Sequence, residues 1–413
     1  MKIIVHRGTK EIGGSSIEVF NEREKILFEI GLPLWCMQNR NYDVKKLLPS
    51  LKGEYSGLFI SHSHLDHYGL INELDMDIPV YLGAATKDLI EFSSLISNSQ
   101  IKIKKSEIIE DRKVIFLASF KITPYLVDHS AVDSYAFLIE SGGKKIFYSG
   151  DFRRHGRKGK LIDRLISNPP PEIDALILEG TNISRLDNAN KETDIEEELT
   201  TFLQRKKKGI TLLMASGQNL DRIVSIYKSC LKSKKTFVID PYLACILDIM
   251  AKYGKFPHLS SKYRNLKLFF SSRITTKLMK ANYEEKIFNF RPFKITKEEI
   301  NQNRDEIVML IRPNMEANLK SLNFEDGTLI WSMWKGYEND ERNRKFLEFL
   351  KSKGVEIIRE IHTSGHADIE TLKAFVKAFN PKSVIPIHTA EPEKYSNIFE
   401  KVKMVNDEEE FEI

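Results

Sequence analysis

The chain has 413 residues, of which 41% are hydrophobic and 29% are charged, values that are ordinary for a globular protein with room for two domains. It contains no apolar run of about eighteen residues, and its first residues lack the apolar core of a secretory signal, which excludes a membrane-spanning helix and argues against export. Its three widely spaced cysteines (Cys36, Cys230 and Cys245) form neither a disulfide framework nor a thiolate metal site, which favours the reducing cytoplasm.

The net charge of +5 is distributed unevenly along the chain. Residues 201–280 carry 17 Lys and Arg against 3 acids, a net of +14, whereas the rest of the chain carries 46 basic and 55 acidic residues. For the single run RKKKG at 205–209 a solvated lysine-rich face is the simpler interpretation. An imbalance sustained over this whole segment instead favours a surface that binds nucleic acid or another polyanion.

Short apolar and β-branched runs alternate with amphipathic helical stretches. The runs predict buried strands at 56–60, 144–150, 174–180, 209–216, 235–240 and 382–388. Helices are predicted at 194–208, at 220–230 and at 368–380. This alternation predicts an α/β layered fold. The most polar stretch, 183–194, is the expected start of a second domain, which ends near 350–355.

Residues capable of chemistry stand at the ends of four predicted strands. They are His62, Asp151, Glu179 and His388. Loops held on rigid strand ends are where α/β folds build their sites. We therefore expect these distant positions to converge on one edge of the fold.

The stretch FISHSHLDHYG at 59–69 places three histidines and one aspartate within six positions. His62 and His64 alternate by two, so they point to the same side of an extended segment. Asp66 and His67 follow where the chain is expected to turn into a helix. Imidazole and carboxylate ligands without thiolate suit zinc, and also manganese or iron. The alternative, surface histidines in a polar loop, is a poor explanation for so dense a cluster.

This stretch resembles the His-x-His-x-Asp-His signature of the metallo-β-lactamase fold. LVDHSAVDSYAF (126–137), YSGDFR (148–153) and PIHT (386–389) are similar to later motifs of that fold. The resemblance implies an αββα sandwich that holds two divalent metal ions, zinc as the first choice and manganese as the second. It implies one ion held by His62, His64, His129 and Asp151, and another held by Asp66, His67, Asp151 and His388.

Three further stretches resemble motifs A, B and C of the β-CASP nucleases, namely LEGTN (178–182), IHTSGHA (361–367) and VIPIHT (384–389). In that group a second α/β domain is inserted into the lactamase fold, and the chain is similar to ribonuclease J in particular. The resemblance implies a metallo-β-lactamase domain at 1–190, an inserted β-CASP domain at 191–352 and a returning lactamase segment at 353–413. GTKEIGGSS (8–16) lacks the ending of a nucleotide P-loop, and the resemblance makes it a tight strand turn that faces the site.

Roles for further residues follow from the same resemblance. His366 would bind the scissile phosphate and protonate the leaving 3′-oxygen, and Glu179 would orient a metal-site histidine. With Asp66, these two residues make up the expected catalytic set. The expected phosphate-binding residues are Thr363, Ser364, Gly365, Ser216 and Gly217. The alternatives are a structural role for each residue taken singly, and an ordinary helix cap at ASGQN (215–219).

These features predict a metal-dependent ribonuclease in which a hydroxide activated by two metals attacks phosphorus, leaving a 5′-phosphate and a 3′-hydroxyl. Cutting from the 5′ end and internal cutting are both open. A DNA nuclease or a small-molecule hydrolase is the second hypothesis, against which the basic segment and His388 argue. A non-catalytic RNA-binding subunit is the third, although no ligand of the motif set is missing. RNA is the expected partner, no membrane is expected, and the absence of the further C-terminal domain usual in ribonuclease J leaves a homodimer open.

Overall fold

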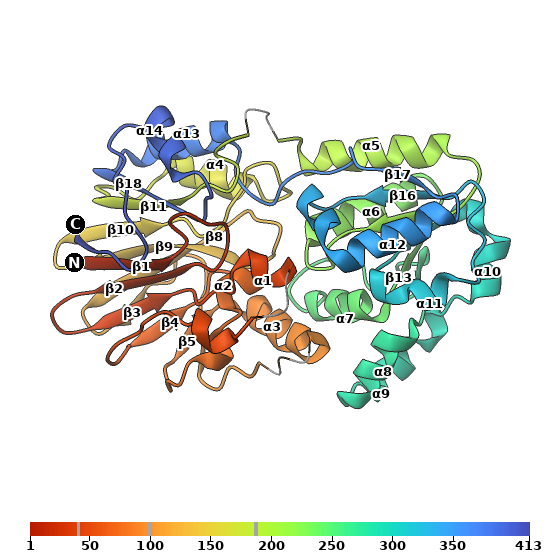
Figure 1. The fold of residues 1–413 in the computed structure, drawn as a ribbon, viewed down its shortest axis with the longest axis horizontal. Helices are drawn as coiled ribbons and strands as arrows, with labels where there is room; N and C mark the ends of the chain where they lie inside the picture. Colours follow the sequence, from red (N-terminus) through yellow and green to blue (C-terminus); the bar gives the residue numbers. More distant parts are fainter. Residues whose placement is uncertain (39–41, 98, 100, 186–188) are drawn as a thin grey trace. The chain divides into compact units, whose positions relative to one another are not determined.

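The computed structural model describes residues 1–38, 42–97, 99, 101–185 and 189–413 (Figure 1). The chain divides into two compact units. Unit 1 comprises Met1–Glu91, Ile101–Ala189 and Gly365–Ile413, and unit 2 comprises Phe92–Gln100 and Asn190–Ser364. The domain boundaries drawn from the sequence at 190/191 and 352/353 stay predictions. Part of the polar stretch on which the first one rests, 186–188, lies outside the described residues.

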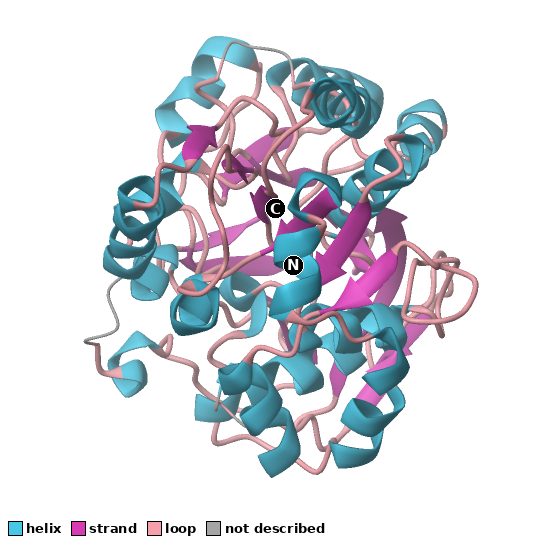
Figure 2. Ribbon diagram, turned by 90° about the vertical axis from the view of Figure 1, so that its right-hand side faces the viewer, coloured by secondary structure: helices cyan, strands magenta, loops and turns pink. Residues whose placement is uncertain are grey.

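Within the described residues, unit 1 contains two sheets, one of seven strands and one of six. The first sheet has the order β19 (Glu410–Glu412), β1 (Lys2–Arg7), β2 (Ser16–Phe20), β3 (Lys25–Phe28), β4 (Gly57–Phe59), β5 (Val80–Leu82) and β6 (Ser106–Ile108). The second has the order β18 (Ser383–Ile387), β11 (Ala175–Glu179), β10 (Lys144–Tyr148), β9 (Ser134–Ser141), β8 (Phe120–Val127) and β7 (Ile115–Leu117). Because β1 and β19 pair, the two termini lie side by side (Figure 2).

The two sheets pack face to face through alternate side chains. In β10, Ile146 and Tyr148 join a buried cluster that contains residues of both sheets, whereas Phe147 joins a different cluster on the outer face. The rings of Phe28 in the first sheet and Phe137 in the second lie 5.2 Å apart. This period of two buries both faces of each strand, which is the pattern expected of a sandwich covered on its outside by helices.

Helices cover the outer faces of both sheets. The first sheet packs against the segment that contains α1 (Leu34–Gln38), α2 (Leu65–Tyr68) and the start of α3 (Ala84–Ser97), with η1 (Val44–Leu47) and η2 (Ile71–Glu73) between these helices. The second sheet packs against α4 (Lys160–Ser167), α13 (Ile369–Phe379) and α14 (Tyr395–Ile398), which follows η7 (Pro392–Lys394). Unit 1 is therefore an αββα sandwich, as predicted.

Unit 2 is an α/β unit built on a parallel sheet. Its strands, in spatial order, are β14 (Leu266–Leu268), β13 (Thr236–Ile239), β15 (Ile307–Leu310), β12 (Thr211–Met214), β16 (Thr328–Trp331) and β17 (Glu356–Ile358). Its helices are α5 (Glu192–Arg205), α6 (Leu220–Lys232), α7 (Pro241–Met250), α8 (Ser272–Lys280), α9 (Glu284–Asn289), α10 (Lys297–Gln302), α11 (Glu316–Leu319) and α12 (Glu341–Ser352). Short 3-10 turns are η3 (Arg291–Phe293), η4 (Arg304–Glu306), η5 (Pro313–Met315) and η6 (Lys335–Asn339).

The predicted elements are confirmed with small changes at their ends. The six predicted strands are β4, β10, β11, β12, β13 and β18, and the three predicted helices are α5, α6 and α13. Among the described residues, no helix combines the length and the apolar character needed to cross a bilayer.

Candidate metal centre

Three neighbouring parallel strands bring the predicted site residues to one edge of unit 1. β10 pairs with β11 and β11 pairs with β18, both in parallel, so the three strands end at the same edge. Asp151 follows β10, Glu179 ends β11 and His388 follows β18. His388 adopts a positive φ of 52°, a conformation that non-glycine residues rarely take. Such strain is typical of side chains whose direction matters to a site.

The histidine motif lies on the first sheet, directly after β4. Gly31 makes this packing possible, because a Cβ at that position would lie 1.8 Å from the carbonyl oxygen of Asp66. Gly13, with φ of 81° in the turn between β1 and β2, approaches the Asp66 side chain in the same way. The turn at 8–16 thus lies beside the motif, where the resemblance placed it. The backbone N–H of Ser15 also donates to the Asp66 carbonyl at 3.2 Å.

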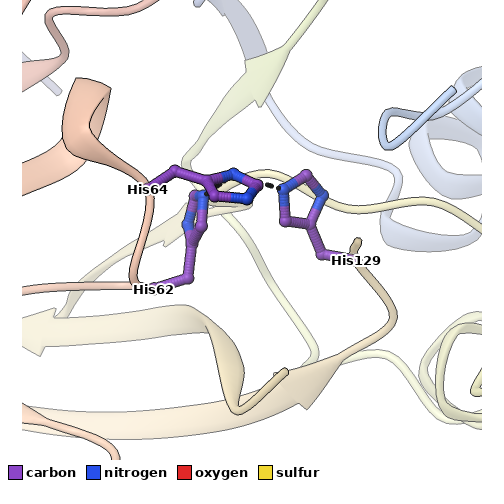
Figure 3. A group of neighbouring side chains, drawn as sticks. All are labelled: His62, His64 and His129. Carbon is purple, nitrogen blue, oxygen red and sulfur yellow. Dashed lines mark hydrogen bonds between the residues drawn. The ribbon is translucent and has the colours of Figure 1, made fainter. Parts of the chain in front are cut away.

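Three imidazoles converge at one end of the site (Figure 3). His64 Nδ1 lies 3.1 Å from His62 Nε2 and 3.2 Å from His129 Nε2. All three ligand atoms lie within 4.8 Å of one another. His129 follows β8 of the second sheet, so this group joins the two sheets at their shared edge.

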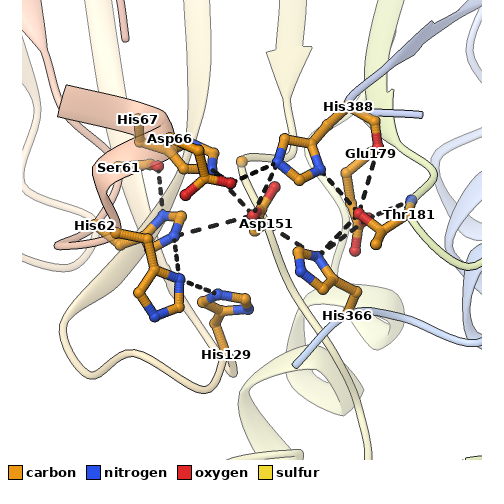
Figure 4. Close-up of polar contacts among 12 residues, drawn as sticks. Ser61, His62, Asp66, His67, His129, Asp151, Glu179, Thr181, His366 and His388 are labelled. Atoms are coloured by element: carbon orange, nitrogen blue, oxygen red, sulfur yellow. Dashed lines mark hydrogen bonds and ion pairs between the residues drawn. The ribbon is translucent and has the colours of Figure 1, made fainter. Parts of the chain in front are cut away.

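Asp151 stands at the middle of the site (Figure 4). Its Oδ2 atom lies 3.0 Å from His67 Nε2, 3.7 Å from His388 Nε2 and 3.9 Å from His62 Nε2. His388 Nε2 in turn lies 3.2 Å from Asp66 Oδ2. Asp66, His67 and His388 form a second group of ligand atoms within 4.8 Å of one another. The seven predicted ligands therefore form one connected cluster with Asp151 at its middle, although their role as ligands stays a prediction.

The protonation states favoured at His62, His64 and Asp151 suit a cation. Asp151 and Asp66, by contrast, outweigh burial and raise the pKa of His67 well above its usual value, so a cation there must displace a proton. Burial, followed by the neighbouring histidines His67 and His129, lowers the pKa of His62 well below its usual value, and burial lowers the pKa of His64 to about 4. Burial alone would raise the pKa of Asp151, but His388 and His67 outweigh it and hold that pKa well below its usual range. Neutral imidazoles and ionised carboxylates are the forms that bind metals.

A further observation supports the fit of a divalent cation. Among the atoms of the described residues, Asp151 Oδ1 is buried with no hydrogen-bond partner. A buried carboxylate oxygen left without a partner is costly unless a cation or water satisfies it. The donor set of imidazole nitrogens and carboxylate oxygens is also the set that zinc and manganese accept.

Glu179 and His366 lie together beside Asp151. His366 Nδ1 is 3.5 Å from Glu179 Oε2 and 3.7 Å from Asp151 Oδ2. The carboxylate of Glu179 also accepts the backbone N–H groups of Thr181 at 3.0 Å and Ala367 at 3.1 Å. Burial lowers the pKa of His366, but Glu179 and Asp151 outweigh burial and raise it. The pair is in place for the predicted roles, which stay predictions.

The five predicted phosphate-binding residues are divided between the two units. Gly365 belongs to unit 1, where a Cβ would lie 2.6 Å from Ser130 Oγ and 3.4 Å from the His129 ring. Thr363 and Ser364 belong to unit 2, as do Ser216 and Gly217. The Thr363 hydroxyl donates to the carbonyl of Asn190 at 2.7 Å, so it is already engaged within unit 2. Phosphate binding by this set stays a prediction.

Two supporting residues were missed by the sequence reasoning. Glu29 follows β3 with φ of 61° and is fully buried, and its Oε1 lies 3.5 Å from His67 Nδ1. The Thr181 hydroxyl lies 2.8 Å from His388 Nδ1 and 3.2 Å from His366 Nδ1. Glu29 stands at a strand end, so the rule that found Asp151 also applies to it. Thr181 lies in the LEGTN stretch and carried no signal of its own.

The chain matches two family models. The Beta-lactamase superfamily domain matches residues 36–198, and the Zn-dependent metallo-hydrolase RNA specificity domain matches residues 355–397. A solved structure of a protein of unknown function from Enterococcus faecalis V583 has a TM-score of 0.82 at 21% identity and covers 99% of both chains. At this identity the structural likeness supports the fold alone.

Curated relatives are named as ribonucleases. Ribonuclease J of Helicobacter pylori (strain ATCC 700392 / 26695) is 22% identical over 94% of this chain and 56% of its own length. Ribonuclease J 2 of Streptococcus pyogenes is 24% identical over 55% of this chain and 43% of its own length. An RNase J-like protein of Methanocaldococcus jannaschii is 24% identical over 93% of this chain and 91% of its own length. The chain thus spans about half the length of the bacterial relatives and most of the archaeal one.

Proposed function

We propose that this chain, a ribonuclease J-like β-CASP protein of the metallo-β-lactamase superfamily, is a metal-dependent hydrolase of RNA phosphodiester bonds. The observation that carries the proposal is the convergence of seven imidazole and carboxylate side chains in one cluster with Asp151 at its middle, with His366 at the side of that carboxylate. The names of the matching relatives and the RNA specificity domain favour RNA as the substrate.

We propose that His62, His64, His129 and Asp151 would hold one divalent ion, and that Asp66, His67, Asp151 and His388 would hold the other. The three histidines of the first set lie within 4.8 Å of one another, as do Asp66, His67 and His388 of the second, which supports this division. Zinc is the first choice and manganese the second. Such a pair lowers the pKa of water to near neutrality and neutralises the charge of a phosphodiester. Hydrolysis of this kind leaves a 5′-phosphate and a 3′-hydroxyl.

His366 is the proposed acid for the leaving 3′-oxygen. Its Nδ1 lies 3.5 Å from Glu179 Oε2, 3.2 Å from the Thr181 hydroxyl and 3.7 Å from Asp151 Oδ2, which sets the ring at the side of the ligand cluster. The raised pKa of His366 keeps the ring protonated closer to neutral pH, where a general acid is needed. Glu179 positions this ring and also fixes the backbone at Thr181 and Ala367. The proposed orienting role of Glu179 therefore falls on His366, while Thr181 contacts His388.

The remaining proposals concern where and how RNA is bound. We infer that the domains divide as 1–190, 191–352 and 353–413, with the inserted part of the β-CASP type. Phosphate would be bound by Thr363, Ser364, Gly365, Ser216 and Gly217, with backbone N–H groups contributing where hydroxyls are engaged.

The three cysteines are buried free thiols, which suits a protein that acts in the cytoplasm. A homodimer remains an open part of the proposal.

The test is cleavage of end-labelled RNA by protein supplied with zinc or manganese. The same sequence is presented with a 5′-monophosphate, a 5′-triphosphate or a 5′-hydroxyl, alongside a DNA strand, and Asp151→Ala is the control. We expect RNA to be cut to products with a 5′-phosphate and a 3′-hydroxyl, and the variant to be inactive. Preference for one 5′ end would assign trimming, and equal internal cutting would assign endonuclease activity. Cleavage of DNA alone, or of neither strand, would refute the proposal.

A further inference from the structure

We propose that residues 153–160, called the basic loop below, form a contact surface for the sugar–phosphate backbone of single-stranded RNA beside the metal centre. Lys158 and Lys160 are its contacts with the ligand. The inference rests on the proposed function for the identity of the polyanion, and it assigns a binding surface within unit 1 itself.

The composition of the basic loop is one-sided. Its sequence, RRHGRKGK, contains five Lys and Arg and no acid, and the next acid along the chain is Asp163. A polyanion-binding surface requires an excess of positive charge, and cations that are buried or paired with carboxylates contribute little to it. The side-chain contacts of each cation in the loop therefore decide which of them can bind RNA.

Arg153 and Arg154 each have a carboxylate partner. The Arg153 side chain is fully buried and its Nε lies 3.7 Å from Asp128 Oδ1. Arg154 Nε forms an exposed ion pair with Asp163 Oδ1 at 2.6 Å. Lys160, by contrast, is exposed at the first position of α4. Lys158 is half-buried, and its Nζ donates to a backbone carbonyl rather than to a carboxylate.

The hydrogen bonds of the basic loop place it against the segment that carries His129. The backbone N–H of Arg153 donates to the Asp128 carbonyl at 2.6 Å, and Lys158 Nζ donates to the Ala131 carbonyl at 3.4 Å. Gly156 permits this close approach, because a Cβ there would lie 2.4 Å from Asp128 Oδ1. The loop also begins two residues after Asp151. Both ends of it are therefore held beside two predicted metal ligands.

An ammonium group in this place suits a phosphate contact. Lysine binds phosphate as a flexible point charge and does not distinguish between bases. Such contacts suit a surface that binds the sugar–phosphate backbone of RNA. The basic segment at 201–280 supplies less surface charge than its composition suggests, since Arg222 is buried against Glu192 and Lys232 pairs with Glu196. The basic loop adds positive charge next to the candidate centre itself.

The experiment compares Lys158→Gln/Lys160→Gln with the unmodified protein. The affinity for a fluorescent single-stranded RNA is measured by anisotropy in a His366→Ala background, at several salt concentrations, and KM and kcat are measured without that background. We expect the dissociation constant and KM to rise at least about ten-fold, the change produced by losing one charge-assisted hydrogen bond. We expect the slope of log affinity against log salt to become shallower by about 1.4, or about 0.7 per lysine. Metal content and kcat should change less than about two-fold.

Two controls separate this role from others. Lys121→Gln/Lys144→Gln removes the same charge near the amino ends of β8 and β10, opposite the ends that lead to His129 and Asp151, and should leave affinity and slope unchanged. Lys158→Arg/Lys160→Arg keeps the charge and should restore binding.

Three outcomes would overturn the inference. One is an unchanged dissociation constant and slope in the Lys158→Gln/Lys160→Gln protein. Another is an equal loss of affinity in the control pair, which would mean that only net charge matters. The third is loss of metal and kcat without loss of affinity, which would mean that Lys158 only holds the segment of His129. Failure of the unmodified protein to cleave RNA refutes the proposed function instead, because binding is measured separately from turnover.

Discussion

Replacing Glu29 with glutamine tests whether the metal centre depends on a residue that lies outside its ligand set. Glu29 is fully buried after β3, its Oε1 lies 3.5 Å from His67 Nδ1, and the backbone N–H of Ser61 donates to the same carboxylate at 3.2 Å. The charge of Glu29 is one of the causes that raise the pKa of His67, after Asp151 and Asp66, against the lowering effect of burial. Glutamine keeps the size of the side chain but removes this charge.

The size of the effect follows from what such a carboxylate does. It lies 3.5 Å from Nδ1 of His67, on the side of the ring opposite Nε2, which faces Asp151 3.0 Å away. Losing a partner of this kind lowers metal affinity about 10- to 100-fold, or about 1.4 to 2.8 kcal/mol. Because His67 belongs to the group with Asp66 and His388, we expect one ion to be weakened and the ion at His62, His64 and His129 to be retained.

The assay is competition for zinc with a coloured chelator, followed to saturation in the unmodified protein and in Glu29→Gln. Tyr148→Phe is the control. The Tyr148 hydroxyl makes a long hydrogen bond of 3.4 Å to Glu29, and its loss should lower the zinc affinity little. Two ions bound by Glu29→Gln as tightly as by the unmodified protein would refute the reasoning. Weakening of both ions equally would show that Glu29 acts on the fold of the site and not on His67.

Three further predictions concern other parts of the chain. His366→Ala should retain metal and RNA binding but lose cleavage by at least about 100-fold in single-turnover assays, and unchanged turnover would remove its role as the acid. Glu192→Gln removes the carboxylate charge that balances the buried Arg222 cation and should cost about 3 to 5 kcal/mol in urea unfolding. A loss below about 1 kcal/mol would contradict this. Burial lowers the pKa of His6, but Glu18 and Glu408 outweigh it and raise the pKa, so the stability that His6 contributes is complete below its ordinary pKa of about 6.5. That contribution should disappear as the pH rises through the raised pKa of His6, and the loss of stability with rising pH should be smaller in Glu408→Gln. The same dependence of the urea midpoint on pH in both proteins would refute this prediction.

The Glu192→Gln prediction has a matched comparison. Glu192→Leu/Arg222→Met replaces the buried ion pair by apolar side chains and should recover most of the lost stability, which Glu192→Gln alone does not. Glu18, which contacts His6, responds to pH in the opposite direction. Burial alone would raise its pKa, but His6, Lys25 and Tyr55 outweigh burial and lower the pKa of Glu18 to about 2. The stability contributed by Glu18 is therefore present above its ordinary pKa and is lost as the pH falls toward about 2.

The ligand set could be predicted because its residues stand in short motifs and directly after predicted strands. His62 to His67 form one dense motif, and Asp151 and His388 each follow a short apolar run that predicts a buried strand. Strand ends in a layered α/β fold meet at an edge, so their convergence followed from the pattern and the family resemblance together.

Pairings made across long stretches of chain carried no such signal. β11 pairs with β18, about 200 residues later, and this register is what sets Glu179 beside the segment of His366 and His388. The buried pair of Glu192 and Arg222 looks in the sequence like two ordinary surface charges. Composition therefore overstated the free charge of 201–280, because burial and pairing are decided by the tertiary structure.

Whether the chain binds two divalent ions is decided by the metal content of the purified protein and of two variants, measured by elemental analysis. We predict about two divalent ions per chain in the unmodified protein. We predict about one in His129→Ala, which removes a ligand of the first group, and about one in His388→Ala, which removes a ligand of the second. An unmodified protein that binds no divalent ion, or variants that both keep two, would refute the two-ion centre.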